Sequence, residues 1–163
     1  MNENDSKQLP ENAMVEDKAL MAKADALFRF VMLYYDFANE KKDYGTGECV
    51  SMVEAHTLME IADHPGITVS FLAERANRTK GAISQTIKKL DHMEYITRQK
   101  TDSDQRIVGL YPTERGMRLH QAHREYDYAE MCSTFDELLE YCSQEELDAF
   151  FRVVNAYLKI FST

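Results

Sequence analysis

The sequence has little of the material that builds disulfide-bonded, zinc-ribbon or sheet-rich proteins. Its three cysteines in 163 residues are an odd number without a CxxC pair, so neither a disulfide framework nor a zinc ribbon fits. Six glycines and three prolines are few for a barrel or a Rossmann-type sheet. No run of about 18 to 20 apolar residues occurs, so we expect no membrane segment. These absences favour a mainly helical protein.

Motifs of targeting and of the common enzyme classes are also missing. The first residues are polar and acidic, whereas a signal peptide is basic and then apolar, so we expect a cytoplasmic protein. There is no glycine-rich phosphate loop, no GxSxG elbow and no Ser, His, Asp order. Glu145 and Glu146 fit the start of a helix, where acidic side chains complement the dipole. We therefore expect no enzyme activity and no cofactor.

Charge is distributed unevenly along the chain. The net charge of −9 by itself argues against nucleic acid. Residues 75–106, however, contain eight lysines and arginines against four acidic residues. A basic segment in an acidic chain is expected where one surface meets a polyanion and the rest avoids it. A charged face exposed to solvent is the alternative interpretation.

Apolar periodicity predicts long helices at both ends of the chain. Residues 1–15 lack such periodicity and are expected to be disordered. In residues 16–47, apolar residues step by three and four from Leu20 to Ala38, which predicts one amphipathic helix and a loop. Residues 113–163 predict two more helices, the last dense in large apolar side chains. Because these surfaces exceed what one small lobe can bury, we expect the N- and C-terminal helices to dimerise.

Residues 48–112 have the pattern of a winged helix-turn-helix. The capping-box pair Ser51 and Glu54 predicts the start of one helix, and Thr68 and Thr79 predict the starts of two more. The helix after Thr79 has a polar face opposite its apolar one, as a recognition helix does. Residues 95–100 and 107–111 predict a β-hairpin, joined by the polar turn 101–106. Such a hairpin is a wing that can place a cation in the minor groove.

This order of elements, and two sequence runs in particular, resembles the MarR family of winged helix-turn-helix transcriptional regulators. The runs are TVSFLAERANRTKGAISQTIKKLDHMEYI (residues 68–96) and DQRIVGLYPTERG (residues 104–116). The second matches the family's wing pattern at Asp104, Arg106, Thr113, Glu114 and Gly116. The resemblance implies a ligand-responsive repressor that binds double-stranded DNA at a pseudo-palindromic operator as a homodimer.

The resemblance and the basic segment together predict the residues that contact DNA. They are Arg78, Thr79, Lys80, Gly81, Ser84, Gln85, Lys88, Arg98, Lys100, Asp104 and Arg106. Arg106 is expected in the minor groove, with Asp104 steadying it. Gln85 stands where the family often has Arg, which favours contact with adenine over guanine. Gly109 and Pro112 stand where the family usually has larger strand residues, which questions the rigidity of the wing.

The resemblance also implies a small aromatic or lipophilic effector, bound between the dimer helices and the DNA-binding lobe. Its pocket is predicted to include Tyr34, Tyr35, His56, Met59 and Met117, an aromatic and thioether lining that suits varied apolar ligands. An ordinary packed core explains the same residues.

Three further alternatives stay open. His120 and His123 could reach one metal ion, and His56 lies near Glu54 on another helix, but the spacing matches no metal motif and we expect no metal. Cys49, Cys132 and Cys142 do not match the position of the cysteine in peroxide-sensing relatives, so redox sensing is not expected. The net charge and Gln85 leave room for a helical dimeric protein-interaction module that has lost DNA binding.

Overall fold

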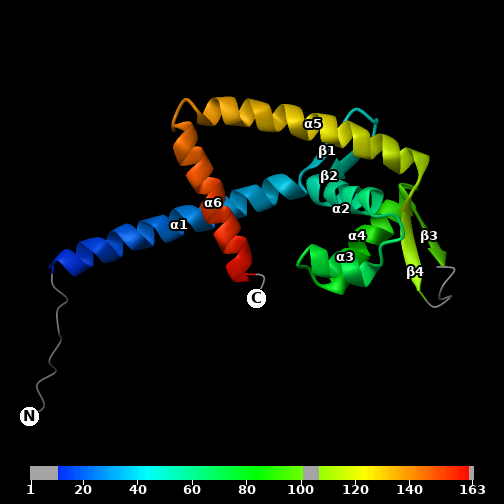
Figure 1. Cartoon of the computed structure of the whole chain (residues 1–163), viewed down its shortest axis with the longest axis horizontal. Coiled ribbons are helices and arrows are strands. Elements are labelled where there is room, and N and C mark those ends of the chain that lie inside the picture. Colours follow the sequence, from blue (N-terminus) through cyan, green and yellow to red (C-terminus); the bar gives the residue numbers. More distant parts are fainter. Residues whose placement is uncertain (1–10, 101–106, 162–163) are drawn as a thin grey trace, which may run out of the picture. The chain divides into compact units, whose positions relative to one another are not determined.

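The computed structural model describes residues 11–100 and 107–161. The chain divides into two compact units, residues 1–40 and residues 41–163 (Figure 1). The first unit contains the helix α1 (Glu11–Asn39), and the second contains five helices and two small antiparallel sheets in its described part. The predicted fold, mainly helical with a β-hairpin, is confirmed.

Helix α1 begins at Glu11, so the expected disorder of residues 1–15 is wrong for the last five of them. Residues 1–10 lie outside the described residues. The physical reason is local composition. Residues 11–15 include Glu, Ala and Met, which have high helix propensity, and Pro10 precedes them at a position that tolerates proline before a helix. Apolar periodicity, which starts later, set the predicted boundary too late.

Three short helices form the predicted helix-turn-helix region. They are α2 (Met52–Asp63), α3 (Val69–Arg75) and α4 (Lys80–His92). The capping box of α2 is present: the Ser51 N–H donates to the Glu54 carboxylate at 2.9 Å, and the Glu54 N–H donates to the Ser51 hydroxyl at 3.2 Å. The hydroxyls of Thr68 and Thr79 cap α3 and α4 by accepting the N–H groups of Phe71 and Ala82. These predicted helix starts are confirmed.

The predicted hairpin consists of β3 (Ile96–Lys100) and β4 (Val108–Pro112), paired from Ile96 with Pro112 to Lys100 with Val108. The turn 101–106 lies outside the described residues. The turn between α2 and α3 packs against β4, since Gly66 N–H donates to Leu110 O at 2.8 Å. A Cβ at Gly109 would lie 3.0 Å from Gly66 O. The small residue at 109 therefore permits this close backbone contact.

A second hairpin was not predicted from the sequence. It pairs β1 (Lys41–Asp43) with β2 (Cys49–Ser51), in a segment expected to be a loop. Its tip is held by Asp43, whose Oδ1 accepts N–H groups from residues 45, 46 and 47 at 2.9 to 3.0 Å. Gly45 and Gly47 there have φ of +87° and +79°, a region that glycine adopts without strain.

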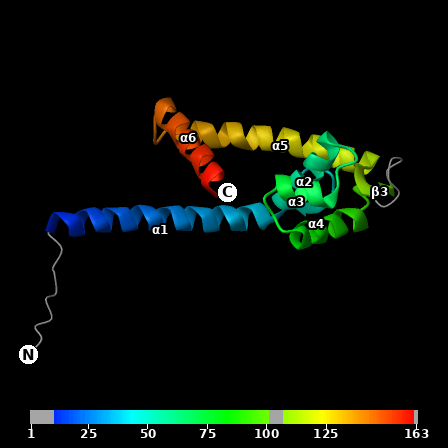
Figure 2. The same ribbon diagram turned by 60° about the horizontal axis from the view of Figure 1, so that its bottom comes forward.

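One core joins α2, α3, α4, the β3–β4 hairpin and the first half of α5 (Glu114–Leu138). Its fully buried side chains include Leu58, Ile61, Ile87, Leu90, Leu110 and Leu119. Figures 1 and 2 show α2, α3 and α4 close together, with α2 packed against α5. A Cβ at Gly116 would collide with the carbonyl oxygen of Tyr95, which explains the need for glycine in this first turn of α5.

The second half of α5 and the last helix, α6 (Gln144–Phe161), have few buried side chains. Phe135 of α5 contacts Phe151 of α6, with ring centroids 5.6 Å apart. Other apolar side chains of α6 are exposed, among them Val153, Leu158 and Ile160. No helix in the described ranges combines the length and apolar character needed to cross a membrane.

Candidate functional site

Helix α4 has two distinct faces, as the sequence predicted. Ile83, Ile87 and Leu90 are buried in the core. On the other face, Lys80, Gly81, Gln85 and Lys88 are exposed and Ser84 is partly exposed. The Thr79 hydroxyl accepts the N–H of Ala82 at 3.2 Å, so Thr79 serves first as the helix cap. The exposed face offers cations and amide groups, which can bind phosphates and base edges.

A hollow of about 660 Å³ lies where α3 meets the start of α4. It is lined by Ser70, Ala73, Glu74, Asn77, Arg78, Thr79 and Lys80. Arg78 and Lys80 are exposed, and neither is ion-paired with any residue that the structure describes. The N-terminus of a helix, with its unpaired N–H groups and two nearby cations, favours an anion such as a DNA phosphate.

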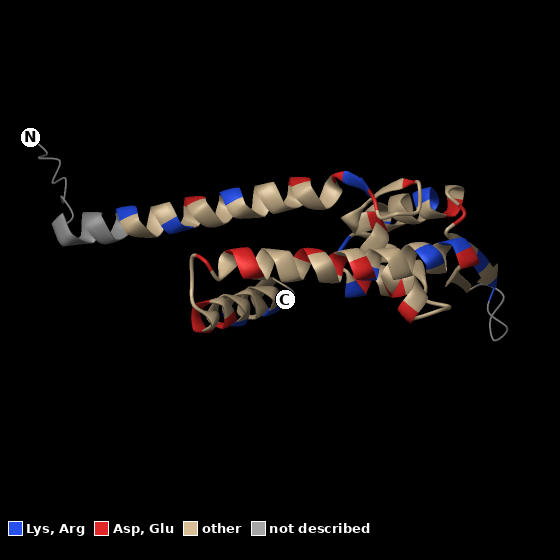
Figure 3. Cartoon of the chain, turned by 90° about the horizontal axis from the view of Figure 1, so that it is seen from above, with Lys and Arg blue, Asp and Glu red and all other residues tan. Residues whose placement is uncertain are grey.

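The hairpin carries two more of the predicted cations. Arg98 Nε donates to Asp91 Oδ2 at 2.9 Å. The carboxylate of Asp91, in the last turn of α4, therefore partly neutralises the charge of Arg98. Lys100 is exposed at the end of β3. Figure 3 shows blue basic segments leading into the hairpin loop and red acidic segments along α5 and α6. Asp104 and Arg106 lie outside the described residues, and their minor-groove role stays a prediction.

Two neighbouring lysines of α4 have different surroundings. Lys88 makes no ion pair within the described ranges, whereas Lys89 Nζ lies 3.1 Å from Glu54 Oε1. The Glu54 side chain is only 4% exposed. Burial acts to raise the pKa of this carboxyl, but the hydrogen bond from Ser51 and the charge of Lys89 hold the pKa below its ordinary value. Glu54 is therefore a charged group inside the domain.

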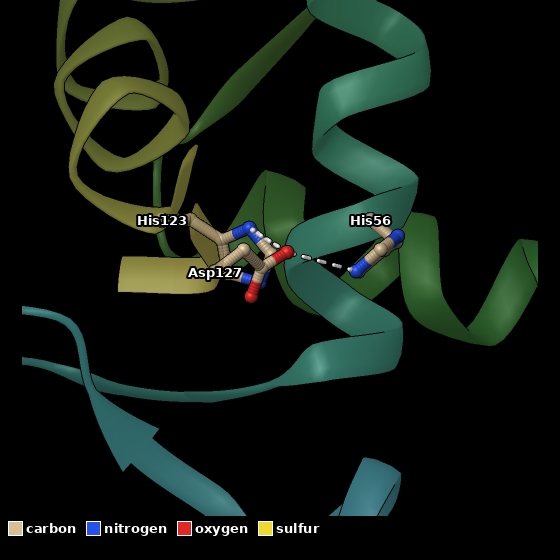
Figure 4. A group of neighbouring side chains, drawn as sticks. All are labelled: His56, His123 and Asp127. Carbon is tan, nitrogen blue, oxygen red and sulfur yellow. Dashed lines mark ion pairs between the residues drawn. The ribbon is translucent and has the colours of Figure 1, made fainter. Parts of the chain in front are cut away.

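A cluster of histidines and a carboxylate connects α2 with α5 (Figure 4). His56 comes from α2, and His123 and Asp127 come from α5. One ligand atom from each lies within 4.8 Å of the other two. Asp127 Oδ2 is 3.3 Å from both His56 Nε2 and His123 Nδ1. The carboxylate thus faces both imidazoles.

His123 is fully buried, and neither of its ring nitrogens makes a well-oriented hydrogen bond with a described residue. Buried polar groups normally have hydrogen-bond partners, so the lack of one at this imidazole needs an explanation. Burial lowers the pKa of His123, and the nearby His56 and His120 act in the same direction, against the opposing charge of Asp127. His123 is therefore neutral at pH 7, the form in which imidazole binds metals.

Aromatic rings cover the buried side of the cluster. The Tyr44 ring lies 4.6 Å from the His123 ring and 5.0 Å from the Tyr126 ring, edge to face in both cases. Burial, with the negative charge of Asp127, raises the pKa of Tyr44 to about 12. Tyr44 stays a neutral phenol and closes the site with an apolar ring.

The structure corrects the histidine pairing considered from the sequence. His120 Nε2 lies 3.8 Å from Asp63 Oδ1, so His120 belongs to a different contact from that of His123. His123 instead meets His56 and Asp127. Sequence reasoning missed Asp127 because Glu54 was the one carboxylate considered beside the histidines and cysteines. The signal was available, since residues 123 and 127 are four apart and share one helix face.

Two nitrogen donors and one oxygen donor suit a first-row divalent metal ion. Zinc in particular binds His and Asp, and a site with three protein ligands leaves one position for water or another group. A metal ion here would tie α2 to α5.

The remaining predicted pocket residues belong to separate parts of the chain. Tyr34 and Tyr35 lie on α1 in the first unit, and Met59 and Met117 lie on α2 and α5 in the second. The small-molecule pocket therefore stays a prediction. Cys49 and Cys132 are exposed free thiols, and no observation tests redox sensing.

Comparison with known proteins gives a consistent result. The model of the MarR family matches residues 50–108. The transcriptional regulator ZitR of Lactococcus lactis subsp. cremoris (strain MG1363) is 28% identical over 148 residues, which cover 86% of this chain and 96% of that protein.

Solved structures share the fold. Streptococcus pneumoniae FabT in complex with DNA has a TM-score of 0.63 and 21% identity, covering 88% of this chain and 96% of that one. The zinc-responsive MarR family member ZitR of Lactococcus lactis has a TM-score of 0.62 and 20% identity, covering 87% and 99%.

The fold and the cationic face of α4 define a winged helix-turn-helix DNA-binding domain. Its capped recognition helix, its hairpin and its connection to long helices agree with the sequence resemblance and with the family match. The chain is similar to the MarR family: its residues 50–108 match that family's model. It is a DNA-binding transcriptional regulator, which disfavours the interaction module without DNA binding.

Proposed function

We propose that this regulator binds a pseudo-palindromic operator as a homodimer and acts as a repressor. The observation that carries the proposal is the polar face of α4, where Lys80, Gln85 and Lys88 are exposed opposite buried Ile83 and Ile87. A helix with such a face fits the major groove, where its side chains reach base edges. The repressor role rests on the sequence resemblance to the family.

Exposed apolar side chains support the homodimer. Val153 and Leu158 of α6 are 54% and 59% exposed, and Val31 of α1 is 53% exposed. Apolar faces of this kind mark interaction surfaces. A two-fold pair would present two recognition helices to two half-sites. We assign residues 16–47 and 113–163 to dimerisation and residues 48–112 to the DNA-binding lobe.

Selection of bound duplexes from random DNA tests this proposal. The expected product is a pseudo-palindrome with half-site centres about 10 base pairs, or a multiple of that, apart. Sedimentation should give a dimer both free and bound. Absence of enrichment over the starting pool would contradict the proposal and restore the interaction-module alternative.

The histidine cluster favours a second candidate function, and we infer that a divalent transition metal ion regulates DNA binding. His56, His123 and Asp127 supply the ligands. A metal ion would bind a ring nitrogen of the buried His123, which makes no well-oriented hydrogen bond with the described residues. The similarity to ZitR of Lactococcus lactis, a zinc-responsive protein, supports zinc as the first ion to test. The small aromatic effector stays the alternative prediction.

The position of the cluster suggests how metal and DNA binding are linked. The ion would tie α2 to α5, and α2 also packs against α4. Metal would thus stabilise the arrangement in which the lobe and its recognition helix are already assembled. We expect metal to strengthen DNA binding, and DNA to strengthen metal binding by the same factor.

His56, on α2, and His64, at the C-terminal cap of α2, provide a matched test of the metal site. His56 and His64 have side chains that are 53% and 49% exposed, but only His56 belongs to the cluster. Competition with a chromophoric chelator should give one zinc ion per protomer. His56→Gln should weaken zinc binding by about tenfold or more, given that even outer-shell changes cost about 10- to 100-fold. His64→Gln should bind zinc like the wild type. Equal affinities for all three proteins would overturn the metal site.

A further inference from the structure

The buried carboxylate of Glu54 joins two helices that have different tasks. Glu54 lies on α2, two residues before His56, and it is the third residue of that helix. Its Oε2 accepts the N–H of Ser51 at 2.9 Å, and its Oε1 meets Nζ of Lys89 on α4 at 3.1 Å. Both oxygens are thus engaged, one at the start of α2 and the other on the recognition helix.

This contact removes Lys89 from the set of cations available to DNA. Lys89 is 62% exposed and lies next to Lys88, which is a predicted DNA contact. The ammonium group of Lys89, however, faces a carboxylate that is almost completely shielded from water. A buried charge that loses the lysine with which it forms an ion pair is strongly unfavourable. Lys89 is therefore held in place, whereas Lys88 has no described partner.

We propose that Glu54 is a positioning residue that fixes the recognition helix α4 to α2 through Lys89 and transmits metal binding at His56 to the DNA-contacting face. The link to metal rests on the proposed function above. The positioning of α4 itself needs only that the protein binds DNA. The Glu54–Lys89 pair contributes no base or phosphate contact of its own.

The Glu54–Lys89 ion pair restricts the orientation of α4 relative to α2 more closely than apolar contacts do. Apolar side chains of α2 and α4 also share one core. Apolar packing tolerates small rotations, whereas an ion pair to a shielded carboxylate restricts distance and direction. Loss of the pair should leave α4 folded but less precisely oriented. Sequence-specific contacts, which need an accurate fit, should weaken more than non-specific phosphate contacts.

The test uses the full-length protein, a duplex selected from random DNA and an unrelated duplex of equal length. Affinities are measured by fluorescence anisotropy over several salt concentrations, with zinc or with EDTA. Glu54→Gln keeps a side chain able to cap α2 and loses the charge. Lys89→Met is the partner variant, and its exposed position keeps the test usable if Glu54→Gln does not fold. Lys88→Met is the matched control.

The Lys88 and Lys89 variants are expected to differ in salt slope and in preference for the selected duplex. Lys88→Met should lower the salt slope by about one, because it loses a phosphate contact. Lys89→Met and Glu54→Gln should leave the slope unchanged and reduce the preference for the selected duplex by about tenfold. The double variant should lose no more than either single one, since both remove the same contact. Zinc should still bind Glu54→Gln, but its effect on DNA affinity should fall to less than half.

Two results would overturn the proposal. One is a salt slope that falls in Lys89→Met as it does in Lys88→Met, which would make Lys89 a phosphate contact. The other is an unchanged preference in Glu54→Gln. A wild type that binds no duplex, or that shows no zinc effect, would instead contradict the proposed function, so the two failures are distinguishable.

Discussion

Zinc should stabilise the folded protein through the His56–His123–Asp127 cluster. An ion that binds only the folded state adds about 2.7 kcal/mol to the free energy of unfolding when its free concentration is about 100 times Kd. For a chain of this size, about 1 kcal/mol corresponds to about 2 to 4 °C in Tm. The expected rise in Tm is therefore roughly 5 to 10 °C.

The structure predicts how this rise depends on residue 56. His56 is half-exposed and contributes little to the core, so His56→Gln without metal should melt close to the wild type. If its zinc affinity is about tenfold lower, the same free zinc adds only about half of the stabilisation. His64 is the exposed histidine at the end of α2 and lies outside the cluster, so His64→Gln should show the full rise in Tm.

Thermal melting in a metal-buffered solution, at several free zinc concentrations, measures all three proteins. A wild type that shows no rise at saturating zinc, or a His56→Gln variant that rises as much as the wild type, would refute the reasoning. The second result would place the zinc effect on other groups, such as the exposed thiols of Cys49 and Cys132.

Two further predictions concern assembly and pH. Phe151→Asp together with Val154→Asp should convert the dimer to a monomer in sedimentation, because the interface would bury unpaired charges; a wild type that is monomeric at micromolar concentration would contradict this. Burial holds the pKa of His123 below its ordinary value of 6.5, so the unfolded chain binds this proton more readily than the folded one. The metal-free protein should therefore lose stability as pH falls below about 6.5. Urea unfolding at several pH values should show this loss in the wild type and a smaller one in His123→Gln, and equal losses in both would contradict the assignment.

Local chemistry made the winged-helix domain predictable. Ser51, Thr68 and Thr79 each cap a helix by accepting the N–H of the residue three positions on. Such contacts fall within one helical turn, so the sequence alone contains both partners. The β3–β4 hairpin was predicted for a similar reason, because its β-branched and aromatic residues flank a polar turn.

Contacts between distant segments were not predictable in the same way. Strands β1 and β2 have three residues each, too few to show an alternating pattern. His56 and Asp127 lie far apart in the sequence and meet only because α2 packs against α5. The ion pair of Lys89 has the same origin, since its carboxylate partner, Glu54, lies on another helix.

Gln85 is the residue at which sequence reading by α4 can be tested. Gln85 is exposed on the polar face of α4, where an amide side chain can pair with the N6 and N7 atoms of adenine. Arg106, in the predicted wing, is expected to contribute a minor-groove contact that depends little on base identity.

The decisive measurement is the affinity of the wild type, Gln85→Ala and Arg106→Ala for the selected duplex and a random duplex, over several salt concentrations. Gln85→Ala should weaken binding to the selected duplex by about 1 to 3 kcal/mol per half-site, with the salt slope nearly unchanged. Arg106→Ala should weaken binding to both duplexes and lower the slope by about one per wing. If Gln85→Ala keeps the full preference for the selected duplex, α4 does not read the sequence there and the account is contradicted.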